Sequence, residues 1–319
     1  MNLVFPFGRP EFKSRRNLGA ARLARITTTV ILIGDGYIET SPKATMTLAP
    51  HPLNRGFVWR DFRPDKPRLL TSDQIADFHR DGFIILRKAF DPAEIANARK
   101  AIDAFESHKE NTVLVMDDQP DLVFDVRKYS FACNLACRSA ILRTLVSGPA
   151  FQGLVYDLIG QNVRLYWDQG VYKKPGQGVE FAWHQDNGYT FTLPQDYLTC
   201  WLPLTDATEE NGCPRILRGV HRDGTYRHDH TENGLEICGL DKDLIDEKSA
   251  SAAVDVGDVV VFSSLTPHMT GPNRTNEPRK AYIVQFIADG ACLVKHNGDR
   301  EPLDDSDNNF FILRNGAPA

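Results

Sequence analysis

Two side chains of types that can bind metal ions, His184 and Asp186, are separated by one residue in the run Trp183-His184-Gln185-Asp186. In an extended strand, residues i and i+2 point to the same face, so we predict that this imidazole and this carboxylate converge. The spacing alone is a weak signal, because a hydrogen-bonded pair on the surface has the same pattern. A third ligand is needed before the pair indicates a metal site.

His268 is that third candidate, since it follows Pro267 just behind the apolar run Val259–Phe262. A histidine at the exit of a strand is well placed to complete a metal site across a barrel. Two histidines and one carboxylate on one face of a metal leave three positions open, as in the non-haem Fe(II) oxygenases. Zinc more often takes three or four protein ligands and has no redox role. The three residues therefore predict an Fe(II) centre that reacts with O2.

Arg279 is a candidate anchor for an acidic co-substrate, eleven residues after His268 and just before an apolar run. A guanidinium that faces inward holds a carboxylate through two parallel hydrogen bonds, and a buried guanidinium needs such a partner. The alternative is an ordinary arginine at a strand end in solvent. Arg274 is a nearby competitor, but it lies in the turn Pro272–Thr275, and we expect it to face water.

The elements that must position these residues begin with two helices. Thr71 or Ser72 caps the first helix, and Gly82 ends it. A short apolar strand, Phe83–Leu86, follows. The second helix opens at Asp91-Pro92, as cap and first-turn proline. Its apolar residues make one stripe: Ile95, Ala98, Ile102 and Phe105.

From about residue 160 the pattern changes to short strands between turns rich in Gly, Pro, Asn and Asp. The strand candidates are Val163–Tyr172, Tyr197–Leu204, Pro214–Leu217, Val259–Ser263 and Ala281–Ile287. Helices first, and then many strands without intervening helices, favour a β-sandwich or barrel with helices packed against it.

From Leu70 to Ala288 the chain resembles the phytanoyl-CoA dioxygenase family. The segments that carry the resemblance are, in order, Leu70-Thr71, Phe78-His79-Arg80-Asp81-Gly82-Phe83, Lys174-Pro175, His184-Gln185-Asp186, Trp201, Asn211-Gly212-Cys213, Gly219-Val220-His221, His268 and Arg279-Lys280-Ala281. Both the order of the segments and the spacing from His268 to Arg279 match the family.

The resemblance implies a fold and a reaction. The fold would be mainly β with helices: a double-stranded β-helix (jelly roll, cupin-like) with the N-terminal helices packed outside. The protein would be an Fe(II)- and 2-oxoglutarate-dependent dioxygenase. It would use O2 to hydroxylate an aliphatic C–H bond of a small molecule or an acyl-CoA-like substrate, and would release succinate and CO2.

The resemblance also implies roles for single residues. His184, Asp186 and His268 would bind iron, and Arg279 would pair with the far carboxylate of 2-oxoglutarate. Three more residues would line the co-substrate pocket, although the last of them is equally suited to core packing: Gln185, Thr270 and Trp201. Related halogenases lack the carboxylate ligand, so the presence of Asp186 favours hydroxylation.

One segment departs from the family pattern. The family commonly has Leu-Pro-Gly-Ser-His where this chain has Leu217-Arg218-Gly219-Val220-His221. Arg218 replaces the proline, which puts the turn geometry in doubt. We interpret His221 as structural, and as the best substitute ligand if His268 does not bind the metal.

Several residues near the metal motif bear on the substrate. Residues that flank the metal motif and are candidates for the substrate pocket are Tyr166, Lys173, Asn187, Tyr189 and Phe191. The aromatic rings suggest an apolar or ring-bearing surface on the substrate, although packing in the core explains them equally well. A CoA thioester needs a basic rim for its phosphates, and the cations available for one are Lys173, Lys174, Arg215 and Arg218. A small free metabolite fits the sequence at least as well.

Composition limits the remaining classes. The 319 residues carry a net charge of -5, with no long basic run outside the N-terminus, which argues against nucleic acid as the main partner. No apolar run approaches the roughly 20 residues that span a bilayer, so we predict a cytoplasmic protein and no membrane partner. The oligomeric state is not specified by the sequence.

Residues 1–45 differ from the rest, with six basic residues and one acid up to Ile33. They are either a transit peptide that directs import into an organelle or a segment ahead of a true translation start at Met46. We favour the second, because Ile26–Ile33 is rich in β-branched residues and not an amphipathic helix. We expect residues 46–319 to form a single domain.

Two alternatives to the dioxygenase remain open at this point. A cupin-like metalloenzyme, such as a lyase or isomerase, would keep the metal ligands but would not need Arg279. A non-catalytic binding protein on the same scaffold would need neither, and the intact triad argues against it.

Overall fold

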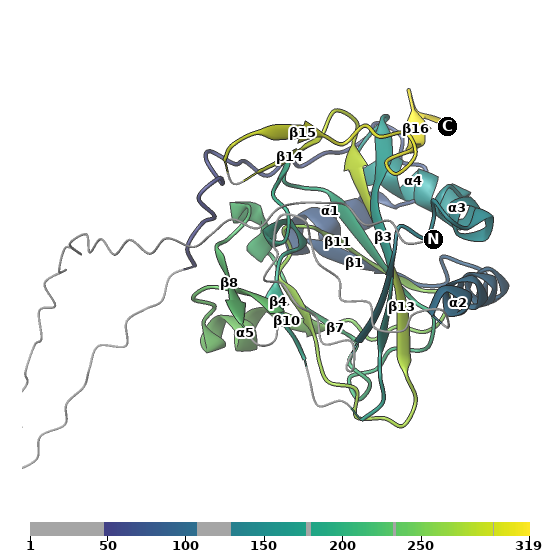
Figure 1. The fold of residues 1–319 in the computed structure, drawn as a ribbon. Coiled ribbons are helices and arrows are strands. Elements are labelled where there is room, and N and C mark those ends of the chain that lie inside the picture. Colours follow the sequence, from purple (N-terminus) through teal and green to yellow (C-terminus); the bar gives the residue numbers. More distant parts are fainter. Residues whose placement is uncertain (1–47, 107–128, 177–179, 232–233, 296) are drawn as a thin grey trace, which may run out of the picture. The chain divides into compact units, whose positions relative to one another are not determined.

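The computed structural model describes residues 48–106, 129–176, 180–231, 234–295 and 297–319 (Figure 1). The predictions about residues 1–45 lie outside this part of the chain. Residues Met46–Ala319 form one unit. No helix in the described residues is both long and apolar enough to cross a bilayer.

The first helix, α1 (Ser72–Asp81), has the predicted boundaries at both ends. Thr71 forms a capping box with Gln74, in which each side chain bonds the backbone N–H of the other residue. Gly82 ends the helix at φ 82°, a left-handed conformation that glycine adopts without a Cβ penalty. The chain then enters β1 (Phe83–Leu86).

The second helix, α2 (Pro92–Glu106), also begins as predicted. The Asp91 side chain accepts a hydrogen bond from the Ala93 amide at 2.8 Å, which caps the first turn. On its apolar stripe, Ile95, Ala98 and Ile102 are buried. Two further helices, α3 (Ala140–Val146) and α4 (Pro149–Leu158), precede the main run of strands.

The larger sheet is antiparallel throughout. Its strands are, in spatial order, β1, β11 (Val259–Ser263), β6 (Leu198–Pro203), β13 (Arg279–Ala288), β3 (Val163–Lys173), β16 (Phe311–Arg314) and β17 (Ala317–Pro318), with β2 (Tyr129–Cys133) also paired to β3. Along β13, Tyr282, Val284 and Phe286 join the core that includes α2, α3 and α4, which Figure 1 shows beside this sheet. Ala281 points to the opposite face of the sheet, as period-two alternation requires.

A second antiparallel sheet covers that opposite face. Its strands are, in spatial order, β10 (Ser249–Ser251), β7 (Pro214–Leu217), β12 (His268–Thr270) and β4 (Phe181–His184). An apolar cluster joins the two sheets, with Trp201 and Phe262 from the larger and Ile216 from the smaller. Two facing sheets with helices outside confirm the predicted jelly roll.

Three smaller elements complete the fold. One three-stranded sheet contains β15 (Arg300–Pro302), β14 (Cys292–Val294) and β5 (Thr192–Leu193), and one hairpin contains β8 (His228–Thr231) and β9 (Gly234–Ile237). The helix α5 (Lys242–Lys248) lies between β9 and β10, so the prediction of strands without intervening helices is wrong there. None of its residues is buried, and it therefore has no apolar stripe to reveal it in the sequence.

Candidate metal centre

Two imidazoles face the same point because their strands are neighbours. His184 ends β4 and His268 begins β12, and the two residues are Cα partners in the antiparallel ladder. The Nδ1 atom of His184 lies 2.7 Å from the Ala182 carbonyl, and that of His268 lies 3.0 Å from the Thr266 carbonyl. A carbonyl only accepts hydrogen bonds, so each ring carries a proton on Nδ1 and turns Nε2 toward the shared point.

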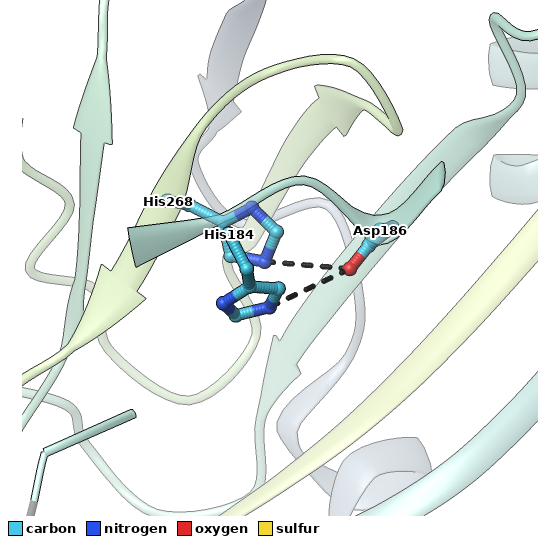
Figure 2. A group of neighbouring side chains, drawn as sticks. All are labelled: His184, Asp186 and His268. Carbon is cyan, nitrogen blue, oxygen red and sulfur yellow. Dashed lines mark ion pairs between the residues drawn. The ribbon is translucent and has the colours of Figure 1, made fainter. Parts of the chain in front are cut away.

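Asp186 reaches the same point from a turn and not from a strand. β4 ends at His184, and Asp186 opens the 3-10 turn Asp186–Gly188, so the predicted i, i+2 strand geometry is wrong for this residue. The turn nevertheless directs the carboxylate back toward the imidazoles (Figure 2). Asp186 Oδ1 lies 3.8 Å from His184 Nε2 and 3.5 Å from His268 Nε2.

The carboxylate is held by its other oxygen. Asp186 Oδ2 accepts hydrogen bonds from Thr199 Oγ1 at 2.6 Å and from Gln285 Nε2 at 3.1 Å. Thr199 and Gln285 are themselves Cα partners on β6 and β13, so the larger sheet supports a ligand that the turn supplies. Oδ1 is left to face the two Nε2 atoms.

These three residues fit a divalent metal ion. Their ligand atoms all lie within 4.8 Å of one another. Nitrogen and oxygen ligands bind such ions at about 2 Å, which places adjacent ligands about 3 Å apart, so the observed separations need only a small closure. Burial lowers the pKa of His184 well below its usual value, and the neighbouring His268 lowers it further. A metal requires this neutral form of the imidazole.

Gln185 points away from the metal group. Its Nε2 donates to the carbonyls of Gly224 at 3.0 Å and Leu265 at 2.6 Å, and its Oε1 accepts from the Tyr226 amide at 2.6 Å. The side chain is fully buried among these backbone groups. This placement differs from the predicted lining of the co-substrate pocket.

Arg279 lies at the far end of the same inner face. It is 2% exposed, and its guanidinium carbon is 5.2 Å from the centroid of the Trp201 ring. Trp201 is two residues after Thr199 on β6, so the two side chains share a face. A line therefore runs from Asp186 and Thr199 past Trp201 to Arg279.

Lys173 and Thr270 join Arg279 at that end. Lys173 is the Cα partner of Arg279 across β3 and β13. Its Nζ is hydrogen-bonded to the Thr270 carbonyl at 3.1 Å, to Thr270 Oγ1 at 3.0 Å and to the Gly271 carbonyl. Burial, and then the charge of Arg279, lower the pKa of Lys173 to about 6. Lys173, predicted as a substrate contact, thus lies with the predicted carboxylate anchor.

The other predicted substrate residues are divided between the metal group and its support. The Tyr189 ring packs edge-on against His184, with ring centroids 5.2 Å apart. The Tyr166 hydroxyl lies 2.7 Å from Thr190 Oγ1. Asn187 is fully buried and bonds Thr192 and Thr225, and Phe191 stacks on His51 at 4.8 Å. The last two therefore hold loops together.

His221 is fully buried but lies outside the group of three ligands. Its ring packs edge-on against Trp59, with centroids 4.4 Å apart. In the same segment, the Arg218 amide donates to the Lys248 carbonyl at 3.0 Å, a bond that a proline cannot make. Gly219 makes the turn at φ 74°.

Sequence reasoning missed several residues of the site. Thr199 and Gln285 hold the ligand carboxylate, and Phe181 lies beside His184 with ring centroids 6.2 Å apart. Gln285 had a usable signal, because it is a polar residue inside the largely apolar run 281–288. Thr199 had none, since threonine is common in strands.

Comparison with known proteins agrees with this geometry. The family model of phytanoyl-CoA dioxygenase (PhyH) matches residues 78–281. The chain is 24% identical over 269 residues to a phytanoyl-CoA dioxygenase domain-containing protein 1 homolog of Dictyostelium discoideum, covering 72% of this chain and 95% of that protein. It is 27% identical over 236 residues to a methylphosphonate hydroxylase of Gimesia maris, covering 72% and 86%.

Solved structures share the fold. The epimerase SnoN in complex with Fe3+, alpha ketoglutarate and nogalamycin RO has a TM-score of 0.59 at 22% identity, covering 76% of this chain and 93% of SnoN. EctD from S. alaskensis with 2-oxoglutarate and 5-hydroxyectoine has a TM-score of 0.59 at 21% identity, covering 86% and 92%.

Proposed function

The chain belongs to the phytanoyl-CoA dioxygenase family, and from that premise we propose which of its residues hold iron, 2-oxoglutarate and substrate. The protein is an Fe(II)- and 2-oxoglutarate-dependent dioxygenase that acts on a small molecule. The observation that carries the assignment is the convergence of two imidazole Nε2 atoms and one carboxylate oxygen.

His184, Asp186 and His268 would hold the iron on one face and leave the opposite face open. When bound, iron and 2-oxoglutarate supply the activation of O2, the oxidative decarboxylation to succinate and CO2, and the transfer of an oxygen atom to a C–H bond. The protein contributes fixed geometry and exclusion of water. The two carbonyls that accept from Nδ1 fix the imidazole tautomers, and Thr199 and Gln285 fix the carboxylate.

At the far end of the same inner face, Arg279 would hold the far carboxylate of 2-oxoglutarate, with Lys173 and Thr270 beside it. A buried carboxylate between two buried cations gains charge-assisted hydrogen bonds that neither cation makes with a neutral group. Trp201 would form the wall between this anchor and the metal, since its ring packs against the guanidinium. Gln185 is assigned to the support of the metal turn and not to the pocket.

For the substrate we assign Tyr189 and Phe181, whose rings flank His184. Tyr166 lies near Asp186. Burial, and then the charge of Asp186, raise the pKa of Tyr166 to about 12, so the phenol stays protonated. These rings favour an apolar group at the reacting carbon. Hydroxylation of an aliphatic C–H bond fits this lining.

We propose a small free molecule and not a CoA thioester. Of the four cations considered for a basic rim, Lys173 is fully buried and Arg215 donates to Ser249 Oγ at 2.9 Å. Lys174 and Arg218 are exposed, which leaves two of the four cations for the phosphates of a CoA thioester. Succinate formation stimulated by an acyl-CoA, and not by the free acid, would overturn this choice.

The reaction class is tested by succinate formation from 2-oxoglutarate and O2 by the Fe(II)-loaded protein. We expect wild-type protein to form succinate, His184→Ala to form none, and Arg279→Ala to lose about 10- to 100-fold in kcat/KM for 2-oxoglutarate, the cost of a charge-assisted pair. Arg274→Ala is the matched control, because that arginine is exposed nearby, and it should behave as wild type.

Two outcomes would contradict the assignments. Full activity of Arg279→Ala would remove the anchor and favour a cupin-like enzyme without 2-oxoglutarate. If wild-type protein forms no succinate, anaerobic binding of 2-oxoglutarate to the Fe(II) protein separates the remaining cases. Binding without turnover means that turnover requires the substrate, whereas no binding removes the 2-oxoglutarate claim.

We further propose that the protein acts in the cytoplasm. None of the six cysteines, all of which lie in the described part of the chain, is paired in a disulfide, as is usual in a reducing compartment. Imaging of the full chain fused at its C-terminus tests this proposal, and an organellar signal would favour import directed by residues 1–45.

A further inference from the structure

The backbone between two metal ligands is tied to a third histidine. The amide of Gln185, the residue between His184 and Asp186, donates to His228 Nε2 at 3.0 Å. His228 begins β8, on a hairpin that contributes no ligand to the metal group. The contact spans 43 residues of sequence, so it joins two separate parts of the fold.

The two ring nitrogens of His228 have opposite roles. Nε2 must be unprotonated, because it accepts from the Gln185 amide. Nδ1 therefore carries the proton and lies 2.9 Å from the Tyr226 carbonyl, which can only accept. A neutral imidazole thus bridges the ligand segment and the loop ahead of β8, and one tautomer satisfies both ends.

The same ring also packs on the turn that carries Asp186. A Cβ placed on Gly188, the last residue of that turn, would overlap the ring, and its three nearest atoms would all belong to His228. The Gly188 backbone is not in the left-handed region, so the ring and not the backbone conformation excludes a larger residue. His228 therefore meets the turn at both ends, by hydrogen bond at Gln185 and by contact at Gly188.

The loop that bonds His228 through Tyr226 is also hydrogen-bonded to the side chain of Gln185. Gln185 accepts from the Tyr226 amide and donates to the Gly224 carbonyl, so its side chain and its backbone hold the same loop from two directions. A segment clamped in this way cannot rotate without breaking several buried hydrogen bonds.

We propose that His228 is a positioning residue for the metal centre, fixing the backbone that carries both His184 and Asp186. This inference rests on the proposed function, because it needs those residues to be ligands. Groups that orient metal ligands typically alter metal affinity or activity by about 10- to 100-fold when they are removed. His228 acts one step further out, on the backbone and not on a ligand side chain.

The test measures Co(II) affinity of the full-length protein by visible absorption, for His228→Ala, His228→Gln and the control His230→Ala. His230 lies on the same strand and is exposed. We expect a loss of about 10-fold or more for His228→Ala and none for His230→Ala. The glutamine amide oxygen can accept from the Gln185 amide, so His228→Gln should recover part of the loss. A thermal melt identifies any variant that fails to fold.

Gly188→Ala gives an independent arm, since its methyl group displaces the His228 ring without removing it. We expect reduced Co(II) affinity in wild-type background and no further reduction in the His228→Ala background. A folded His228→Ala protein with wild-type affinity, or additive effects of the two substitutions, would overturn the inference. Absence of Co(II) binding by wild-type protein would instead remove the metal assignment itself.

Discussion

At the scale of single residues, Lys173 is the most unusual group beside Arg279, a buried amine with its pKa lowered to about 6. Near pH 7.5 the free protein therefore holds Lys173 largely neutral, with two N–H groups for the two carbonyls and a lone pair that accepts from the Thr270 hydroxyl. A carboxylate placed beside it favours the charged form, so its pKa rises on binding. Binding of each 2-oxoglutarate molecule must then be accompanied by the uptake of up to about one proton.

The sign of this linkage gives a prediction. Above pH 6 the free amine must first be protonated, so 2-oxoglutarate affinity should fall as pH rises, by up to about tenfold per pH unit until the pKa of the complex is reached. Anaerobic titration of the Fe(II) protein at pH 6.5, 7.5 and 8.5 measures the slope, and calorimetry in buffers of different ionisation enthalpy measures the proton.

Lys173→Met is the control for that experiment, since it keeps the buried length without a titrating group. The variant should bind 2-oxoglutarate more weakly and with a smaller dependence on pH. A wild-type slope no steeper than that of Lys173→Met would mean that Lys173 does not meet the carboxylate.

At the scale of elements, the cap of α1 contains none of the metal ligands. A substitution there should therefore change the stability of the protein without changing its activity. Thr71→Ala removes the acceptor for the Gln74 amide and half of the capping box. We expect unfolding to become easier by about 1 kcal/mol, a shift of roughly 2–4 °C in Tm for a domain of this size. Urea unfolding measures the change.

Thr71→Ser keeps the hydroxyl and should restore most of that stability. Both variants should form succinate at the wild-type rate per folded molecule. A loss of turnover without a loss of stability would show that α1 influences the metal centre directly.

Local signals explain which elements the sequence predicts. The start and end of α1, the start of α2, and the strands β7 and β11 all have the predicted boundaries, because each is marked by a cap, a glycine or an apolar run. The exposed helix α5 has no such pattern and was missed. The end of β4 before Asp186 was also missed, since no residue there marks the change from strand to turn.

The candidate site divides in the same way. The three ligands and the buried arginine can be predicted because their residue types and their spacing are visible in the sequence. The residues that hold them were not, because their contacts join positions 13, 99 and 43 apart: Thr199 and Gln285 to Asp186, and His228 to Gln185. Such contacts depend on sheet register, which a single sequence does not specify.

At the scale of the whole molecule, the start of the described chain is hydrogen-bonded to residues 223–227. Residues 49–54 run beside the loop that Gln185 and His228 hold. The His51 amide donates to the Thr225 carbonyl at 2.8 Å, and the Arg227 amide donates to the Ala49 carbonyl at 2.7 Å. Asn54 Nδ2 donates to the carbonyls of Asp223 and Thr225, at 2.8 and 3.1 Å. We call residues 49–54 the strap. Through these bonds the strap holds residues 223–227, which in turn contact the turn that carries Asp186.

Two truncations separate this strap from the residues before it. A chain that starts at Met46 keeps the strap, so we expect the Tm and Co(II) affinity of the full chain, in line with the single unit Met46–Ala319. A chain that starts at Arg55 loses all four hydrogen bonds, and its Co(II) affinity should fall by at least about tenfold, the effect of removing groups that orient ligands. Asn54→Ala in the full chain removes two of the bonds without shortening it and should give an intermediate loss. Equal affinity in the Met46 and Arg55 chains would show that the ligand turn needs no support from the strap, and that the loop 223–227 is fixed by the hairpin alone.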